Sequence, residues 1–240
     1  MPFNDNVFFE FLTGTGDKTV TEGTDALIAK FKKKSQKTHR FTFDAMASPT
    51  AMLNNSIPNL LLVKIKRTWL EMKKTAMCRI FLMGHGDWKN HKIGDWSAHH
   101  VASLCNEARV PADIAHINVL GCRLGRDEQF SIDGLVAHSM NSFGSHFHYL
   151  LGAIHGVRTR VFARVYSVAI NPETKKDIMG RTIPQGATGT VKNDSVTRAH
   201  VIFHEVEEFL YEEETALHRR LQSKYVFYWE GNSQKRKWAY

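Results

Sequence analysis

Two short glycine-flanked motifs in this sequence contain residues capable of covalent chemistry. The tripeptide Gly-His-Gly occupies residues 84–86, and Gly-Cys-Arg occupies residues 121–123. Each follows an apolar run that predicts a buried strand. A thiolate can attack a peptide carbonyl, and an imidazole can protonate the leaving amine. We therefore predict that His85 and Cys122 form a catalytic pair at the ends of two neighbouring strands.

Acyl transfer has a second requirement, which is a set of N–H donors for the developing oxyanion, and the glycines of these motifs could help to meet it. Gly86 leaves its backbone N–H unobstructed beside the histidine, and the N–H of Cys122 is the natural second donor. Gly84 and Gly121 permit the tight turns that such loops need. The predicted oxyanion hole therefore consists of the Gly86 and Cys122 amides.

Alternating strands and helices must position these loops. The pattern predicts a first helix beginning near Thr24 as N-cap, and a second with Pro58 in its first turn. Strands are expected at residues 7–12, 40–46, 78–83, 117–120, 149–154 and 161–169, and helices at 24–34, 57–74, 97–108 and 132–143. Such alternation predicts a three-layer α/β/α sandwich with a mainly parallel sheet, whose strands carry ligand-binding loops at their carboxyl ends.

The pattern changes after Asn171. Residues 180–193 are rich in Gly and Thr and predict a surface loop, and residues 206–221 predict an amphipathic helix. The final residues, 224–240, predict a β-hairpin around Glu-Gly-Asn-Ser. We expect a catalytic core at residues 1–170 and an extension at 171–240 of loop, helix and hairpin flap, within the same domain.

Composition describes an ordinary globular chain of 240 residues, with 42% hydrophobic and 23% charged residues. Its apolar runs are far shorter than the roughly 20 residues of a membrane-spanning helix. The first eleven residues lack the basic region of a classical signal peptide, so we expect synthesis in the cytoplasm. Three widely spaced cysteines indicate no disulfide framework. A formal charge of +8 favours an anionic partner.

Three segments together resemble the caspase-like (clan CD) cysteine peptidases. They are Ile-Phe-Leu-Met-Gly-His-Gly at residues 80–86, Asp-Trp-Ser-Ala at 95–98, and His-Ile-Asn-Val-Leu-Gly-Cys-Arg-Leu at 116–124. Within that clan the chain looks most similar to the C80 peptidases, the self-cleaving domains of MARTX and large clostridial glucosylating toxins. The motifs cover residues 78–170, and the order of elements extends the similarity to Val7.

The resemblance implies a caspase-like fold, a His85 and Cys122 dyad, and a substrate pocket lined by the strand near 161–168. Family members often orient the histidine with an upstream carboxylate. Asp44 is the first candidate, and Asp17 or Asp87 could serve instead. The C80 domains are activated by inositol hexakisphosphate on a basic surface with a hairpin flap. The corresponding cations here would be Lys224, Lys235, Arg236 and Lys237.

The function predicted from these features is a cysteine endopeptidase acting on proteins or peptides by an acyl-enzyme mechanism. We expect a bacterial effector or toxin component acting in the cytosol of a host or target cell, with no nucleic acid as partner. The alternative is a catalytically inactive caspase-like module whose basic surface binds a polyphosphate or nucleic acid. A deamidase or acyltransferase could use the same dyad. The remaining histidines complete no recognisable ligand set, so no metal is expected.

Overall fold

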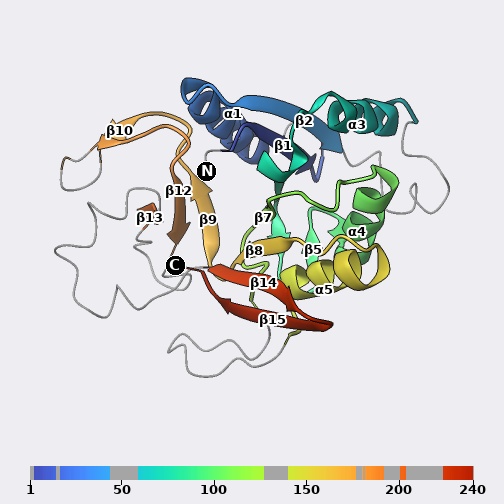
Figure 1. The fold of residues 1–240 in the computed structure, drawn as a ribbon. Helices are drawn as coiled ribbons and strands as arrows, with labels where there is room; N and C mark the ends of the chain where they lie inside the picture. The colour runs from blue at the N-terminus through green and yellow to red at the C-terminus, as the bar shows by residue number, and fades with distance from the viewer. Residues whose placement is uncertain are drawn as a thin grey trace.

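The computed structural model describes residues 3–14, 17–43, 59–126, 140–176, 180, 182–191, 201–203 and 224–239. A seven-stranded sheet with the order β15-β14-β8-β7-β3-β1-β2 runs through the molecule (Figure 1). Its strands are β1 (Asp5–Phe11), β2 (Lys37–Phe43), β3 (Cys78–Gly84), β7 (His116–Leu120), β8 (Arg160–Arg164), β14 (Lys224–Glu230) and β15 (Ser233–Trp238). The first five pair in parallel, and the last two form an antiparallel hairpin beside β8.

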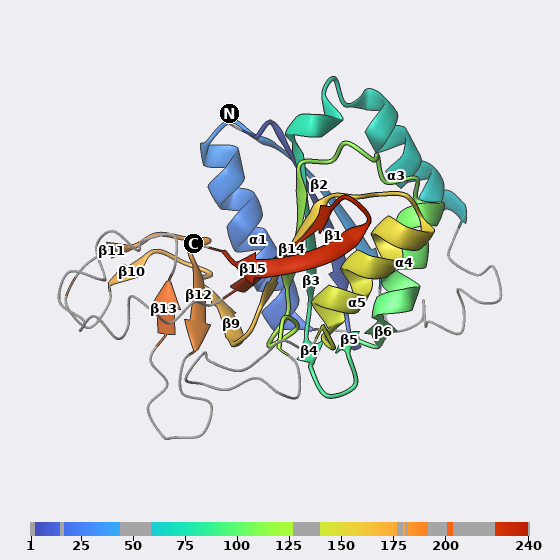
Figure 2. The ribbon, with the colours of Figure 1, turned by 60° about the horizontal axis from the view of Figure 1, so that its bottom comes forward.

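Helices cover both faces of this sheet. Figure 2 shows α1 (Lys18–Lys33) on one face, and α3 (Asn59–Glu71), α4 (Ala98–Glu107) and α5 (Phe143–Tyr149) on the other. A short 3₁₀ helix, η1 (Thr75–Met77), precedes β3, and a π-helical turn, η2 (Leu150–Ile154), extends α5. The predicted α/β architecture with a mainly parallel sheet is therefore confirmed. Among the described residues, no helix is both long and apolar enough to cross a bilayer.

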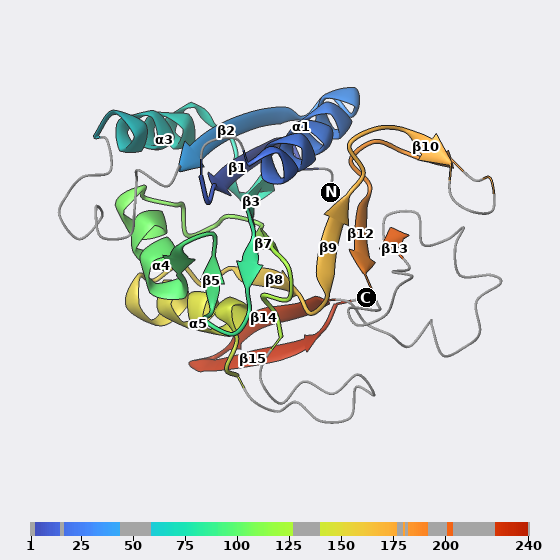
Figure 3. The ribbon, with the colours of Figure 1, turned by 180° about the vertical axis from the view of Figure 1, so that it is seen from behind.

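In the part of the chain that the structure describes, three smaller sheets lie outside the main one. The first contains β4 (Gly86–Asp87), β5 (Lys92–Ile93) and β6 (Trp96–Ser97), directly after the predicted catalytic histidine. The second contains β9 (Ser167–Ile170), β12 (Thr188–Val191) and β13 (Val201–Phe203), which lie side by side in Figure 3. The third pairs β10 (Lys175–Lys176) with β11 (Thr182–Ile183). The second sheet approaches α1, because Gly23 of that helix contacts Ile170 of β9.

The apolar core has two parts, one on each face of the sheet. Alternating side chains of β1 serve both: Phe9 packs in the larger cluster with the α3, α4 and α5 layer, whereas Phe8 packs against Leu27 and Phe31 of α1. All seven residues of β1 are buried. A central parallel strand covered on both faces is expected to be continuously apolar. The sequence of β1 departs from that pattern at Asp5, Asn6 and Glu10.

Glu10 is a fully buried carboxylate on β1, and an ion pair compensates it. Arg40 of β2 donates from Nε and Nη2 to its two oxygens at 2.6 and 2.8 Å. The same guanidinium donates from Nη1 to Asp25 of α1 at 2.7 Å. Removing one partner of a buried ion pair leaves the other charge unpaired, which lowers the stability of the fold by several kcal/mol. This network joins α1 to two strands and so fixes the helix that begins beside the predicted site.

The predicted start of the first helix is wrong. Helix α1 begins at Lys18, and the Asp17 side chain caps it by accepting from the Val20 N–H at 3.3 Å. Thr24 lies inside the helix, where its buried hydroxyl donates to the Val20 carbonyl oxygen at 3.0 Å. Asp and Thr are both good N-cap residues, so local propensity does not choose between them.

Three further expectations are corrected by the structure. Residues 149–154 are not a strand, because α5 ends there and η2 follows it. Residues 161–169 form two strands, β8 and β9, which belong to different sheets. Residues 180–193 are not simply a loop, since their described part contains β11 and β12. Short apolar runs fit a buried strand and a buried helix equally well, and only packing decides between them.

Other expected elements are confirmed or lie outside the described residues. The helices expected at 57–74 and 97–108 are α3 and α4, and the C-terminal hairpin is β14 and β15. The strand expected at 40–46 begins earlier, at Lys37. The helix expected at 206–221 lies outside the described residues, as do residues 132–139 of the helix expected at 132–143. The expected end of that second helix is wrong, because residues 140–142 are not helical and α5 begins at Phe143. The division at residue 170 stays a prediction.

Candidate active site

The strands that precede the two predicted catalytic residues are neighbours in the sheet. β3 and β7 pair in parallel, with Met83 opposite Leu120. Both strands end at the same edge of the sheet. His85 is the first residue after β3, and Cys122 is the second residue after β7. Parallel strands align their carboxyl ends, and ligands bind at such edges.

His85 and Cys122 line a common cavity of about 250 Å³. Its walls come from the start of α1, from the ends of β3 and β7, and from β9. The lining residues are Thr19, Val20, Met83, Gly84, His85, Leu120, Gly121, Cys122, Val168, Ala169 and Ile170. Apart from His85 and Cys122, this wall is almost entirely apolar. The cavity therefore presents a polar pair at one side of a pocket suited to an apolar side chain.

The His85 ring contacts a buried carboxylate. Its Nε2 lies 3.1 Å from Oδ1 of Asp17, and that side chain is only 7% exposed whereas the imidazole is 50% exposed. With Nε2 donating to Asp17, the other ring nitrogen, Nδ1, can accept or release a proton. The backbone is also held, because the His85 carbonyl accepts from the Gly94 N–H at 2.7 Å. Asp17 thus contacts the ring while it caps α1.

Cys122 differs from the other two cysteines in its exposure. Cys78 and Cys105 are fully buried, and burial raises the pKa of each thiol to about 12. Cys122 is partly exposed in the cavity, and the Val168 N–H of β9 donates to its Sγ at 3.4 Å. Only a thiolate is an effective nucleophile. Of the three, Cys122 is therefore the thiol placed to react.

The turn after Cys122 is held in an unusual backbone conformation. Arg123 has a φ of 58°, in the left-handed region that non-glycine residues rarely adopt. Its N–H donates to the Tyr166 carbonyl at 3.1 Å, and the Gly125 N–H donates to the Arg164 carbonyl at 2.6 Å. These bonds tie the cysteine loop to the segment that joins β8 to β9.

The two predicted oxyanion donors lie on backbones that touch. A Cβ placed on Gly86 would lie 2.6 Å from the Cys122 nitrogen and would overlap its carbonyl oxygen. Such distances leave no room for any side chain at residue 86. The loops of the histidine and the cysteine are therefore packed against each other at residues 86 and 122.

The other predicted carboxylates have different surroundings. Asp44 lies outside the described residues. Asp87 caps a turn, because its oxygens accept from the Asn90 side-chain amide at 2.7 Å and from the Asn90 N–H at 3.1 Å. These bonds to Asn90, the side-chain one first, hold the pKa of Asp87 below its ordinary value. Of the described candidates, Asp17 is the one that contacts His85.

The cations predicted to bind a polyphosphate lie on the C-terminal hairpin, where they divide between its two faces. Lys237 lines a second cavity, and the Lys224 ammonium lies 5.5 Å from the ring centroid of Phe162 in its wall. Arg236 stacks over Tyr225 at 4.4 Å. Alternation along β15 puts Lys235 and Lys237 on one face and Arg236 on the other. In the described ranges, no three His, Cys, Asp or Glu side chains are grouped to hold a metal ion.

A match to a known protein family spans the residues of this site. The model of the Peptidase C80 family matches residues 14–179. The chain belongs to the peptidase C80 family. Membership implies cysteine peptidase activity on a peptide substrate. The matched range contains Asp17, His85, Cys122 and β9, whereas the C-terminal hairpin lies beyond it. No curated protein matches the chain.

We predict that Gly86→Ala lowers both stability and peptidase activity, because the new methyl group must displace the Cys122 backbone. The expected stability loss is about 1–3 kcal/mol, typical of overpacking. Gly14→Ala is the matched control, since no atom lies within 4 Å of its added Cβ. Thermal unfolding and cleavage rates test both variants. Wild-type stability and rate in Gly86→Ala would show that the contact between the two loops is dispensable.

Proposed function

We propose that this C80 family member is a cysteine endopeptidase in which Cys122 is the nucleophile and His85 the acid–base group. The observation that carries the proposal is the common cavity into which both side chains open. The Cys122 thiolate attacks the substrate carbonyl carbon, and the amides of Gly86 and Cys122 stabilise the resulting oxyanion. His85 then protonates the leaving amine as the C–N bond breaks. Water hydrolyses the thioester and restores the thiol.

Asp17 is the proposed orienting carboxylate, in preference to Asp44. Its support is the 3.1 Å separation of its Oδ1 from His85 Nε2 and the burial of its side chain. A buried carboxylate fixes the tautomer of the imidazole and stabilises the imidazolium formed during proton transfer. The resulting triad uses the N-cap residue of α1 and two residues that lie just after the ends of β3 and β7.

The cavity supports an apolar residue on the acyl side of the cleaved bond. Val20, Met83 and Ile170 provide much of its wall, and none of the described lining residues is Lys or Arg. An acidic side chain would lose its hydration there without gaining a cationic partner. We therefore propose leucine or methionine at this position, rather than aspartate.

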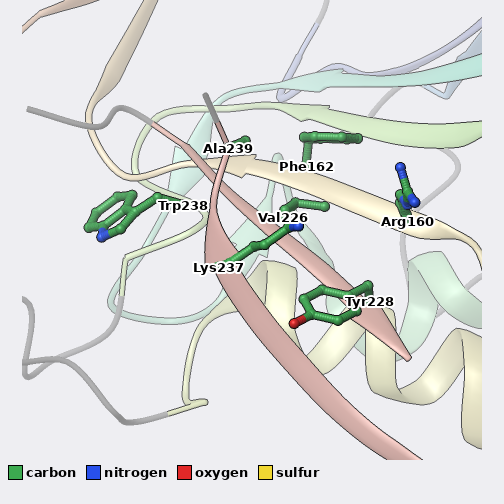
Figure 4. A pocket seen from close by; sticks show the side chains of 7 residues that line it. All are labelled: Arg160, Phe162, Val226, Tyr228, Lys237, Trp238 and Ala239. Atoms are coloured by element: carbon green, nitrogen blue, oxygen red, sulfur yellow. The ribbon is translucent and has the colours of Figure 1, made fainter. Parts of the chain in front are cut away.

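The larger cavity beside the hairpin supports a polyanionic activator, for which inositol hexakisphosphate is the candidate. It has a volume of about 640 Å³, and Figure 4 shows its wall of Arg160, Phe162, Val226, Tyr228, Lys237, Trp238 and Ala239. Nearby His116 gives an independent sign of positive potential. Burial, and then the charges of Arg79, Lys224 and Arg160, lower the pKa of His116 to about 4. Clustered cations of this kind favour phosphate groups.

The proposal extends to an effector or toxin component acting in another cell's cytosol. Its support is the family resemblance, because the C80 domains described above belong to large toxins. A polyanion that activates the peptidase only after delivery would confine cleavage to the target cell.

We predict that a peptidyl ketone probe with leucine at the acyl position labels Cys122 alone. Cys122→Ala should abolish both labelling and cleavage of a positional peptide library read by mass spectrometry. Cys105→Ala is the control and should retain both, because its thiol is buried. Cleavage by folded Cys122→Ala would disprove the proposed nucleophile. Absence of labelling in wild type, with and without hexakisphosphate, would favour the inactive binding module instead.

Asp17→Asn is expected to lower kcat at least about 10-fold with little change in KM, because the ring loses its orienting charge. Asparagine is also a good N-cap, so α1 should remain intact. Asp44→Asn is the matched comparison and should retain wild-type kcat. Steady-state kinetics on one peptide substrate, with thermal unfolding as the folding check, separates the two carboxylates. The reverse result would assign the orienting role to Asp44.

Replacing Arg160 and Lys237 together by glutamine should weaken hexakisphosphate binding at least about 10-fold at physiological salt, because two phosphate partners are lost. Calorimetric titration measures the affinity, and the concentration that gives half-maximal peptidase activity should shift in parallel. Lys64→Gln with Lys66→Gln removes two cations from α3 and should leave both quantities unchanged. Equal loss in both double variants would mean that net charge, rather than this cavity, determines binding.

A further inference from the structure

Helix α3 carries two apolar faces, and only one of them is packed. Leu62, Ile65 and Trp69 point into the core, and the Trp69 Nε1 donates to the Ala108 carbonyl at 2.9 Å. On the opposite side, Leu60, Val63 and Leu70 are 65%, 56% and 86% exposed. These three, with Arg67, recur at the spacing of one helix face. Of the five large apolar side chains that the described residues leave exposed, three lie on this stripe.

The charges around this stripe are almost all positive. The cations of the helix and of the residues just after it are Lys64, Lys66, Arg67, Lys73 and Lys74. The single acid is Glu71, which accepts from Arg67 Nε at 2.8 Å along the same helix face. An apolar stripe flanked by lysines and arginines is the pattern of a helix that lies in a membrane interface.

We propose that this surface, the α3 stripe, docks reversibly on an anionic lipid bilayer. Leu60, Val63 and Leu70 would enter the boundary between headgroups and acyl chains, while the flanking cations contact lipid phosphates and carboxylates. The helix is already held by its inner face, so docking requires no folding. Figures 1 and 3 show α3 at an outer corner of the molecule, beside β2. The proposal is independent of the peptidase function.

Charge argues against two other occupants. A second copy would bring five cations of each α3 region against five of the other, with one acid apiece to compensate them. An acidic protein partner would satisfy the charges, but it would need a groove of its own to receive a convex helix. A bilayer surface supplies negative charge and a deformable apolar layer together.

The test is co-sedimentation of the full chain with vesicles of phosphatidylcholine, either alone or with about one third phosphatidylserine. Wild type should sediment with the anionic vesicles and be released by high salt. Leu60→Ser with Leu70→Ser should reduce the bound fraction at least about 10-fold, because both side chains leave the lipid interface. Substitutions at such exposed positions change stability little, and thermal unfolding verifies the fold.

Two control variants make the result specific to this surface. Ile154→Ser removes an aliphatic side chain that is 60% exposed on η2, and binding should be unchanged. Arg160→Gln with Lys237→Gln removes cations from the hairpin cavity and should also leave vesicle binding unchanged. Binding that survives the Leu60 and Leu70 substitutions, equal binding to neutral vesicles, or no binding by wild type would each overturn the proposal. Capture of an acidic amphipathic peptide in place of vesicles would overturn it as well.

Discussion

The contact between the Gly86 and Cys122 backbones is the constraint on which the candidate site depends. A side chain at residue 86 would overlap the Cys122 peptide, so the two loops can pack this closely only with glycine at that position. The parallel pairing of β3 with β7 prepares the contact by ending both strands at one edge. A shift of one residue would turn alternate side chains to the wrong face of a sheet that is buried on both sides. Strand register in the core therefore determines the geometry of a site at its surface.

The three cysteine thiols are chemically identical but differ in their position relative to this edge of the sheet. Cys78 begins β3 and Cys105 lies on the inner face of α4, so both are sealed in the core that supports the sheet. Removing a thiolate from water is costly, and burial accordingly raises the pKa of both thiols. Cys122 follows its strand instead of lying within it, and it opens into the cavity. The difference in exposure among the three thiols thus follows from where each cysteine lies relative to the sheet.

Much of this arrangement could be predicted from the sequence, because strongly apolar runs specify β3 and β7 and glycines mark where they end. That was sufficient to place His85 and Cys122 at one edge. The orienting carboxylate could not be chosen in the same way, since Asp17, Asp44 and Asp87 all follow or adjoin predicted strand ends. The choice depends on where α1 begins. Two good capping residues compete for that start, and α1 begins directly after Asp17, which contacts His85, whereas Asp44 lies outside the described residues. The η2 turn was missed for a related reason, because its apolar residues fit either type of element.

The segment that joins β8 to β9 explains how two sites on different strands can act together. Arg160 and Phe162 of β8 line the basic cavity, and a few residues later the Val168 N–H of β9 donates to the Cys122 sulfur. Between them, the Tyr166 and Arg164 carbonyls accept from the loop that follows Cys122. Under the proposed function, a polyanion bound at Arg160 would therefore contact a strand that is followed, a few residues later, by the residues that hold Cys122. The left-handed Arg123 makes that loop sensitive, because such a conformation persists only while its surroundings enforce it. If the proposed activator acts along this path, no large motion is required, because the hydrogen bonds from the cysteine loop to the β8–β9 connection and from β9 to the Cys122 sulfur already link the two regions.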